Sequence, residues 1–298
     1  MNYIVFQCYG NEGVFHECTY ALLSLSRLYK PGQPSDLEIW IYTDNPGWFQ
    51  SFKGCMLPLH FQVINSGTIK QWRGAIDFVH RVKLEMLKDF AQNRNGNILY
   101  ADTDVVFTHP LDEVFEQTGE GKLYMHTCEG VVSGNGNPML RKLNNYLREN
   151  VPVKVNGKPI QDLAMWNAGV LAFNTKLRYL LDDALTFTDS EYPRFPKHII
   201  EQFACSVGFQ QVGDVKAAAP YIMHYWNLKE ARIVLASFFA WFKDRSWDEL
   251  VRYGALIQMH VLMQEKVNFL HNRGISGKLL KKQWQPPNYD WKQVEKQV

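Results

Sequence analysis

An alternation of short apolar runs with longer helical stretches is the feature that most restricts how this chain can fold. Four runs have the length and apolar content of buried strands: residues 3–8, 37–43, 60–64 and 97–101. Residues 16–30 and 76–91 lie between these runs and carry apolar side chains at helical spacing. Strands that alternate with helices predict an α/β fold with a mostly parallel, Rossmann-like central sheet flanked by helices.

The rest of the chain predicts a continuation of the sheet and then a helical end. Residues 122–127 and 168–173 are further expected strands, and a helical pattern after them is clearest over residues 247–271. A chain of 298 residues accommodates one large α/β domain with appendages. We therefore predict a main domain over residues 1–228 and a C-terminal helical extension over residues 229–298.

Charge and cysteine content restrict the classes of partner and the compartment. The net charge of +2 is too small to predict a nucleic-acid partner. The five cysteines are scattered without a CxxC motif, which argues against a disulfide framework or zinc knuckle and favours a reducing compartment. The first residues do not resemble a signal peptide, and no run of roughly 18 uncharged apolar residues occurs. These features predict a cytoplasmic protein.

Two carboxylates follow the expected strand at residues 97–101 directly. Asp102 and Asp104 are one residue apart in the sequence ILYADTDVVF. In parallel α/β sheets, ligands bind beyond the carboxyl ends of the strands, and this pair lies at such an end. Close carboxylates repel each other unless a cation neutralises them, and oxygen ligands suit Mg²⁺ or Mn²⁺. Such a cation can neutralise a diphosphate leaving group. A strand-end turn capped by Asp is the alternative explanation for the tripeptide alone.

Further motifs follow in an order that resembles a known family. Arg81 precedes the carboxylate pair, and the segment WNAGVLAFN begins at Trp166. Glu201 and Gln202 come next, followed by His224 and then Lys229. Over about residues 1–230 the chain resembles the GT-A fold glycosyltransferases, especially the retaining family 8 enzymes of the glycogenin and lipopolysaccharide galactosyltransferase group. The stretch around the carboxylates also resembles related sugar transferases that act on mannosyl or similar donors.

The resemblance implies a metal-dependent enzyme whose GT-A catalytic domain spans residues 1–228. It would move a hexose from a nucleotide-diphosphate sugar to a glycan or lipid-linked acceptor, with retention of stereochemistry. Asp102, Asp104 and His224 would bind Mn²⁺ or Mg²⁺, and Lys229 would bind the diphosphate of the donor.

The same resemblance implies roles for residues around the sugar and the nucleoside. Gln202, together with Asp104, would act at the reacting centre. The residues implied to bind substrate are Tyr9, Asn11, Arg81, Asp102, Asn167, Ala168, Gly169, Glu201 and Lys229. Tyr9 and Asn11 follow the first strand, where the base and ribose lie in this fold.

Each of these residues also has an ordinary structural explanation, and the chain departs from the family at two places. His224 alone is equally typical of a buried, hydrogen-bonded histidine, and Arg81 alone of a solvated helix residue. Asn167 suits a turn. The family usually has Gly between the His and the Lys and a Pro-Trp pair after the Lys, which are absent around Lys229. Its acidic residue before Gln is usually Asp, where this chain has Glu201.

Two other classes of protein remain as alternatives. The segment beginning at Asp102 also fits the DxDx(T/V) signature of haloacid-dehalogenase phosphatases, in which the first Asp is the nucleophile. That class has its motif on the first strand and a later GDxxxD, but here Ala218 replaces the second Asp after Asp214. A non-catalytic sugar-binding protein of the same fold is the second alternative, although it would be expected to lose the metal carboxylates.

The C-terminal tail mixes basic with apolar side chains. Lys278, Lys281 and Lys282 alternate with leucines, and Trp284 follows, with Tyr289 and Trp291 further on. Basic residues interleaved with Leu and Trp are typical of segments that lie at an anionic membrane surface. The sequence thus predicts peripheral contact with the inner face of the membrane, and the alternative is a terminal helix that packs its apolar side chains onto the domain.

Overall fold

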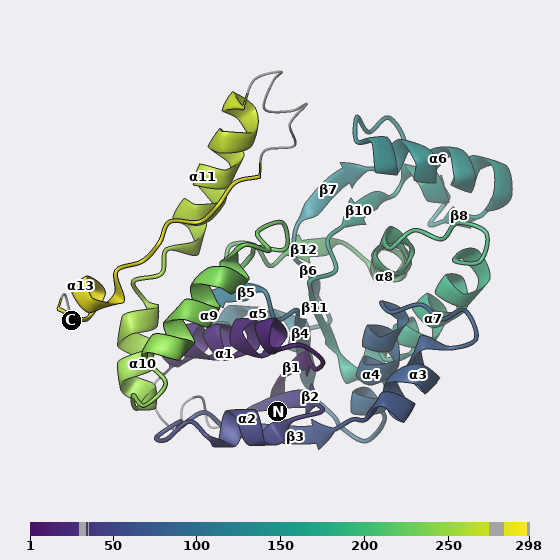
Figure 1. The fold of residues 1–298 in the computed structure, drawn as a ribbon. Helices are drawn as coiled ribbons and strands as arrows, with labels where there is room; N and C mark the ends of the chain where they lie inside the picture. Colours follow the sequence, from purple (N-terminus) through teal and green to yellow (C-terminus); the bar gives the residue numbers. More distant parts are fainter. Residues whose placement is uncertain (30–33, 35, 274–282, 297–298) are drawn as a thin grey trace.

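A computed structural model describes residues 1–29, 34, 36–273 and 283–296 of the chain, and its centre is a seven-stranded sheet (Figure 1). The strands lie in the order β12-β6-β11-β4-β1-β2-β3. Their bounds are β1 (Asn2–Cys8), β2 (Leu37–Thr43), β3 (Leu59–Val63), β4 (Asn97–Ala101), β6 (Leu123–Met125), β11 (Val170–Asn174) and β12 (Val215–Ala217). β1 pairs in parallel with β2 and β4, β2 with β3, and β12 with β6, whereas β11 is antiparallel to β4 and β6. The predicted α/β fold with a mostly parallel sheet is therefore confirmed.

Alternate side chains of β1 point into two separate hydrophobic cores on the two faces of the sheet. Ile4 and Phe6 belong to one core, and Tyr3 and Val5 belong to the other, as the two-residue period of a strand requires. The first core is covered by α1 (Glu12–Ser26), α2 (Pro46–Gln50), α5 (Asp112–Gly119), α9 (Ala231–Trp241) and α10 (Trp247–Gly254). The second is covered by α3 (Ser66–Arg73), α4 (Arg81–Gln92), α7 (Tyr179–Glu191) and α8 (Ile199–Val212).

Short strand pairs extend the molecule beyond the main sheet. β7 (Cys128–Val131) pairs with β10 (Ala164–Trp166), and β5 (Val105–Phe107) pairs with β13 (Ile222–His224), both antiparallel. The other elements of this part are α6 (Pro138–Asn150), β8 (Lys154–Val155), β9 (Lys158–Pro159) and the 3-10 turns η1 (Ile160–Asp162) and η2 (Thr175–Leu177). A third small core joins α6 and β10 to α8, so this lobe lies beside the carboxyl end of the sheet (Figure 1).

Three predicted helices differ from the observed ones. The helix expected over residues 16–30 spans Glu12–Ser26, because Asn11 caps it four residues earlier through the Val14 N–H. The helix expected over residues 76–91 begins only at Arg81, because Gly74 and Asp77 have positive φ angles and the segment from 74 to 80 turns. The helix expected over residues 247–271 is broken at 255–258 into α10 and α11 (Met259–Asn272). The start of α4 matters for the site, because it decides which residues of the first turn point toward the sheet.

The tail packs its aromatic side chains onto the domain. Trp284 and Trp291 are 8% and 6% exposed, and Trp291 Nε1 donates to Ser237 Oγ on α9 at 3.1 Å. Trp291 is the first residue of α13 (Trp291–Glu295), and its ring centroid lies 5.6 Å from that of Phe238 on α9. The prediction that Trp284 and Trp291 lie at a membrane is therefore wrong, because burial against the first core stabilises them more. The leucines and lysines predicted beside them, at 278–282, lie outside the described residues.

Residues on both sides of position 228 contribute to the first core, since α9 and α10 pack against α1. The division into a catalytic domain and a C-terminal extension remains a prediction. In the described part of the chain, no helix is long and apolar enough to cross a membrane.

Candidate active site

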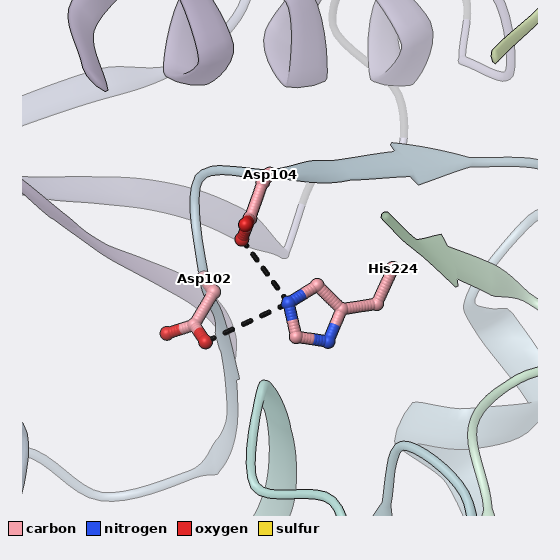
Figure 2. Close-up of side chains that lie close together, drawn as sticks. All are labelled: Asp102, Asp104 and His224. Atoms are coloured by element: carbon pink, nitrogen blue, oxygen red, sulfur yellow. Dashed lines mark hydrogen bonds and ion pairs between the residues drawn. The ribbon is translucent and has the colours of Figure 1, made fainter. Parts of the chain in front are cut away.

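The carboxylate pair lies where the central strand β4 ends. The backbone N–H of Asp102 donates to Gly169 O at 2.7 Å, so the first residue after β4 is still tied to the segment before β11. The chain then passes through Thr103 and enters β5 after Asp104. Both carboxylates are thereby held on a three-residue bend at the carboxyl end of the sheet, as predicted from the sequence (Figure 2).

His224 reaches this bend through the pairing of β13 with β5. It is the last residue of β13 and lies opposite Val105 in the antiparallel register. The backbone N–H of Tyr225, the next residue, donates to Asp104 O at 3.0 Å. This short ladder places an imidazole beside two carboxylates from which it is separated by some 120 positions in sequence.

The three side chains form a cluster with the chemistry of a divalent cation site. His224 Nε2 lies 3.1 Å from Asp104 Oδ1 and 3.8 Å from Asp102 Oδ2, and one ligand atom of each residue lies within 4.8 Å of the others (Figure 2). Ligands bound to one cation at about 2.1 Å lie up to about 4.2 Å apart, so small side-chain movements would suit Mg²⁺ or Mn²⁺. Two carboxylate oxygens and an imidazole nitrogen also match the donor types that Mn²⁺ accepts.

The orientation of the His224 ring is set by Asn167. Asn167 Oδ1 accepts the Gly169 N–H at 3.0 Å and lies 3.1 Å from His224 Nδ1. Because that oxygen is an acceptor, Nδ1 donates to it, and Nε2 is therefore the nitrogen that faces the carboxylates and would bind a cation. A second partner that fixes the tautomer of a metal-binding histidine is a regular feature of such sites.

Asp104 is held in its ionised form. Burial by itself raises the pKa of the Asp104 carboxyl, but the hydrogen bonds and charges of His224 and Lys229 outweigh it and hold the pKa well below its usual range. Lys229 Nζ donates to Asp104 Oδ2 at 2.9 Å, and its side chain is 60% exposed. A cationic, largely exposed side chain thus lies next to the candidate cation site.

Position 169 has to be a glycine, because the His224 ring lies too close to leave room for a Cβ. An added Cβ at Gly169 would overlap the imidazole, with Nε2 at 2.9 Å and two other ring atoms closer. We expect Gly169→Ala to displace His224 and to weaken binding of Mn²⁺ with UDP or GDP by about 10–100-fold, as for lost orienting groups. Calorimetry measures this, with Gly213→Ala as control because its Cβ would meet open space in an extended backbone. Affinity at the wild-type level in Gly169→Ala would show that the ring can move without cost.

A buried ion pair forms one wall of the site. Lys83 Nζ lies 2.9 Å from Glu201 Oε1 and donates to Ala168 O at 2.9 Å. Both charged residues are almost fully buried. Burial opposes the charge of Lys83, but Glu201 and Asp102 outweigh it and raise the pKa of the ammonium. Glu201 and Ala168 are thus brought to the site, where Glu201 neutralises a buried lysine.

Arg81 does not reach the cavity. Its Nε and Nη2 donate to Asp189 at 2.7 and 3.0 Å, and its Nη1 contacts Glu85 at 2.8 Å. Lys83, two residues later in the first turn of α4, points toward the sheet instead. The sequence pattern located the correct helix, but the late start of α4 assigns the inward position to Lys83, which sequence reasoning missed.

Glu129 is the second residue that sequence reasoning missed. It lies on β7, and its carboxylate accepts from Gln202 Nε2 at 3.0 Å and from Asn167 Nδ2 at 3.2 Å. It therefore connects Gln202 on α8 to the Asn167 that orients His224. No local motif marks Glu129, because only the packing of β7 against β10 and α8 brings it there.

These side chains line a cavity of about 250 Å³, close to the small end of ligand pockets. Asp102, Asn167, Ala168, Gly169, Glu201, Gln202 and His224 contribute to it, with Lys83, Glu129, His80, His198 and Trp226. Burial and the neighbouring Lys83 lower the pKa of His80 to about 4, so this ring is neutral near pH 7. Trp226 is 52% exposed at the edge of the cavity.

Tyr9 and Asn11 lie after β1 and do not line this cavity. Asn11 Oδ1 accepts the Val14 N–H at 3.3 Å and so caps α1, while Gln7 Nε2 donates to Tyr9 OH at 3.2 Å. Burial raises the pKa of the Tyr9 hydroxyl. Since β1 is parallel to β4, both residues follow the same edge of the sheet as Asp102.

Three of the solved structures that match the chain are of glycosyltransferases. The galactosyltransferase LgtC, in complex with donor and acceptor sugar analogs, is 14% identical, with 73% of this chain and 74% of LgtC covered and a TM-score of 0.49. Mouse xyloside xylosyltransferase 1, in its apo form, is 14% identical, with 73% and 86% covered and a TM-score of 0.48. The apo glycosyltransferase GlyE of Streptococcus pneumoniae TIGR4 is 17% identical, with 84% of this chain and 62% of GlyE covered and a TM-score of 0.49.

No protein-family model matches the chain, and no curated protein matches it. The solved structures named above are at most 17% identical to the chain. Identities this low do not determine the chemistry of the site.

Proposed function

We propose that the protein is a metal-dependent glycosyltransferase that uses a nucleotide-diphosphate sugar as donor. The cluster of Asp102, Asp104 and His224 carries this proposal, because it joins two carboxylates and an oriented imidazole at the carboxyl end of a parallel sheet. The cluster opens into a cavity whose lining includes the hydrogen-bonding side chains of Glu129, Asn167 and Gln202, which suit a sugar. A divalent cation held there would neutralise the charge of a departing diphosphate.

The residues around the candidate cation site would contact different parts of the donor. Lys229 is exposed enough to exchange Asp104 for a phosphate oxygen and so to stabilise the leaving group. Gln202 and Glu129 are hydrogen-bonded to each other at 3.0 Å and also line the cavity, and the reacting sugar carbon would be bound beside them. Substituents of the sugar would meet Asn167, Glu201 and the backbone beside Gly169, while Tyr9 and Asn11 would meet the base and ribose.

The finer parts of the proposal concern the substrates. We propose a hexose as the transferred sugar, transfer with retention through an oxocarbenium-like centre, and a glycan or lipid-linked acceptor. The cation would be Mn²⁺ or Mg²⁺. The half-exposed Trp226 offers an aromatic face at the entrance of the cavity, on which a sugar ring can stack.

Thermal denaturation with nucleotides separates this function from its alternatives. We expect UDP or GDP with Mn²⁺ to raise the melting temperature, because a ligand that binds only the folded state stabilises it. A non-catalytic scaffold should not respond to either nucleotide, and a phosphatase should respond equally to phosphate without the nucleoside. Asp214, the first Asp of the candidate GDxxxD segment of a phosphatase, is exposed just before β12 and does not line the cavity.

We expect His224→Ala to weaken Mn²⁺-dependent nucleotide binding by about 10–100-fold, as is typical for the loss of a ligand or an orienting group. The variant removes Nε2 from the cluster and leaves both carboxylates. Calorimetric titration of UDP or GDP, with and without Mn²⁺, measures the change. If the Mn²⁺ dependence is unaltered, His224 is a core residue only.

Peripheral membrane contact remains a proposal that now rests on Lys278, Lys281 and Lys282, since Trp284 and Trp291 are buried. We expect co-sedimentation with anionic vesicles that weakens with salt, because each lysine near such a surface contributes about 1 kcal/mol. Replacing the three lysines by Gln should abolish the co-sedimentation without removing the buried tryptophans. Full-length protein that stays in the supernatant at low salt contradicts this proposal.

A further inference from the structure

A second buried ion pair lies next to the candidate cation site, on the side opposite Lys83. Arg232 on α9 donates to Glu17 on α1 through Nε and Nη2, each at 2.9 Å from one carboxylate oxygen. Glu17 is 1% exposed, whereas the side chain of Arg232 is 34% exposed. The carboxylate is thus enclosed in the domain, and the guanidinium that it holds reaches the surface.

The stem of Arg232 lies against the first turn of α1. A Cβ added to Gly13 would meet Arg232 Cδ at 2.9 Å and Asn11 Oδ1 at 3.2 Å. The absence of a side chain at Gly13 therefore makes room for Arg232 beside Asn11. Asn11 is the residue that we propose as a contact of the donor's ribose.

Arg232 also lies close to a residue of the candidate cation site. The backbone N–H of Arg232 donates to Lys229 O at 3.2 Å, so the two cationic residues are one turn apart. Lys229 contacts Asp104 directly. The hydrogen bonds to Glu17 and the nearby charges of Glu17 and Asp104 raise the pKa of Arg232. Arg232 therefore has Asn11 near its stem, and one turn before it lies Lys229, which contacts Asp104.

Glu17 orients the guanidinium of Arg232 but accepts from only two of the three guanidinium nitrogens. The carboxylate engages Nε and Nη2, and in the described residues Nη1 has no hydrogen-bond partner. Such a pair adds little to the stability of the fold, because the free energy of burying the carboxylate offsets most of the attraction between the two charges. A fixed arginine fork with a free amino group is, by contrast, well suited to a phosphate.

We propose that Arg232 binds the donor's diphosphate at the phosphate attached to the nucleoside, and that Glu17 is its positioning residue. The inference rests on the proposed function. In a nucleotide-sugar, this phosphate is linked to the ribose on one side and to the second phosphate on the other. Arg232 has a neighbour suited to each, since Asn11 lies near its stem and Lys229 lies one turn before it. Arg232 and Lys229 then contact successive parts of the same leaving group.

Calorimetry with UDP and with GDP, each in the presence of Mn²⁺, tests this role. We expect Arg232→Gln to weaken binding of the nucleotide that the wild type binds by about 10–100-fold, the usual effect of losing a charged hydrogen bond. Arg232→Lys should recover part of the affinity, because it keeps the charge but loses the fork. Glu17→Gln should weaken binding less than Arg232→Gln, since the arginine remains but is no longer held. Arg252→Gln, an exposed residue of α10, is the matched control and should bind as the wild type does.

The titrations are made at a temperature at which circular dichroism shows each variant to be folded. A dissociation constant of folded Arg232→Gln within twofold of the wild-type value would overturn the role of Arg232 while leaving the proposed function intact. A wild-type protein that binds neither UDP nor GDP with Mn²⁺ would overturn the proposed function and this inference together.

Discussion

Asp104→Asn is expected to reduce sugar transfer by at least about 100-fold while the protein stays folded, because Asn keeps the size of the side chain but removes a charged ligand. Asp104 is the best enclosed carboxylate of the cluster, with contacts to His224 Nε2 and Lys229 Nζ. The variant loses the ion pair with Lys229, which is mostly exposed, so the cost in stability should be small. Release of nucleoside diphosphate from the donor, measured with Mn²⁺ supplied, gives the turnover.

Asp102→Asn should be almost as severe. Asp102 is more exposed than Asp104 but also accepts a hydrogen bond from Tyr100 OH. Asp214→Asn is the matched control, because Asp214 is an exposed aspartate outside the cavity. Turnover near the wild-type rate in either cluster variant would show that these carboxylates do not bind a metal needed for catalysis.

Lys83→Met is expected to lower the free energy of unfolding by about 3–5 kcal/mol, because it leaves the buried carboxylate of Glu201 without a counter-charge. Met retains the length of the lysine stem, so the loss comes from charge and from the hydrogen bond to Ala168 O. Urea denaturation measures the change. Lys88→Met on the same helix is the control, since its pair with Asp182 is partly exposed and should contribute at most about 1 kcal/mol.

The loss of unfolding free energy in Lys83→Met should be larger at high pH than at low pH. Burial raises the pKa of Glu201, and Lys83 opposes this rise in the wild type. Without Lys83 the folded-state pKa lies further above the unfolded value of about 4.3, so the protonated form is favoured on folding. Stability from this group is fully present below the unfolded pKa and is lost as pH rises, so the deficit should be larger at pH 8 than at pH 5.

The double variant Lys83→Met/Glu201→Gln separates charge from packing. It removes both members of the pair, so most of the stability lost in Lys83→Met should return. A Lys83→Met protein as stable as the wild type, or a deficit that does not change between pH 5 and pH 8, would show that Glu201 is neutral in the native protein.

Local sequence signals identified the sheet and the carboxylates. β2 and β4 were predicted with their observed bounds, because each is an apolar run ended by turn or charged residues. Asp102 and Asp104 follow β4 directly, so their place at the strand end required no tertiary information. His224 could be proposed as the third ligand of the cation from the order of motifs. The distance between His224 and Asp104, however, depends on the pairing of β13 with β5.

Residues that reach the site through packing escaped prediction. Lys83 was missed because the apolar pattern predicted a helix start at residue 76, while Gly74 and Asp77 delay the helix to Arg81. Glu129 lies in a short exposed strand with no periodic pattern. No local pattern marks Arg232, because its partner Glu17 is a buried residue more than two hundred positions earlier in the sequence.

The most direct test of the central claim is the release of nucleoside diphosphate from a panel of UDP- and GDP-sugars by the wild-type protein, with Mn²⁺ and with a chelator. The structure leads us to expect turnover of at least one donor with Mn²⁺, its loss on chelation, and a rate at least about 100-fold lower in Asp104→Asn with Mn²⁺. Turnover that continues in the chelator, or no turnover of any donor by a protein that is folded and supplied with Mn²⁺, would contradict a metal-dependent glycosyltransferase.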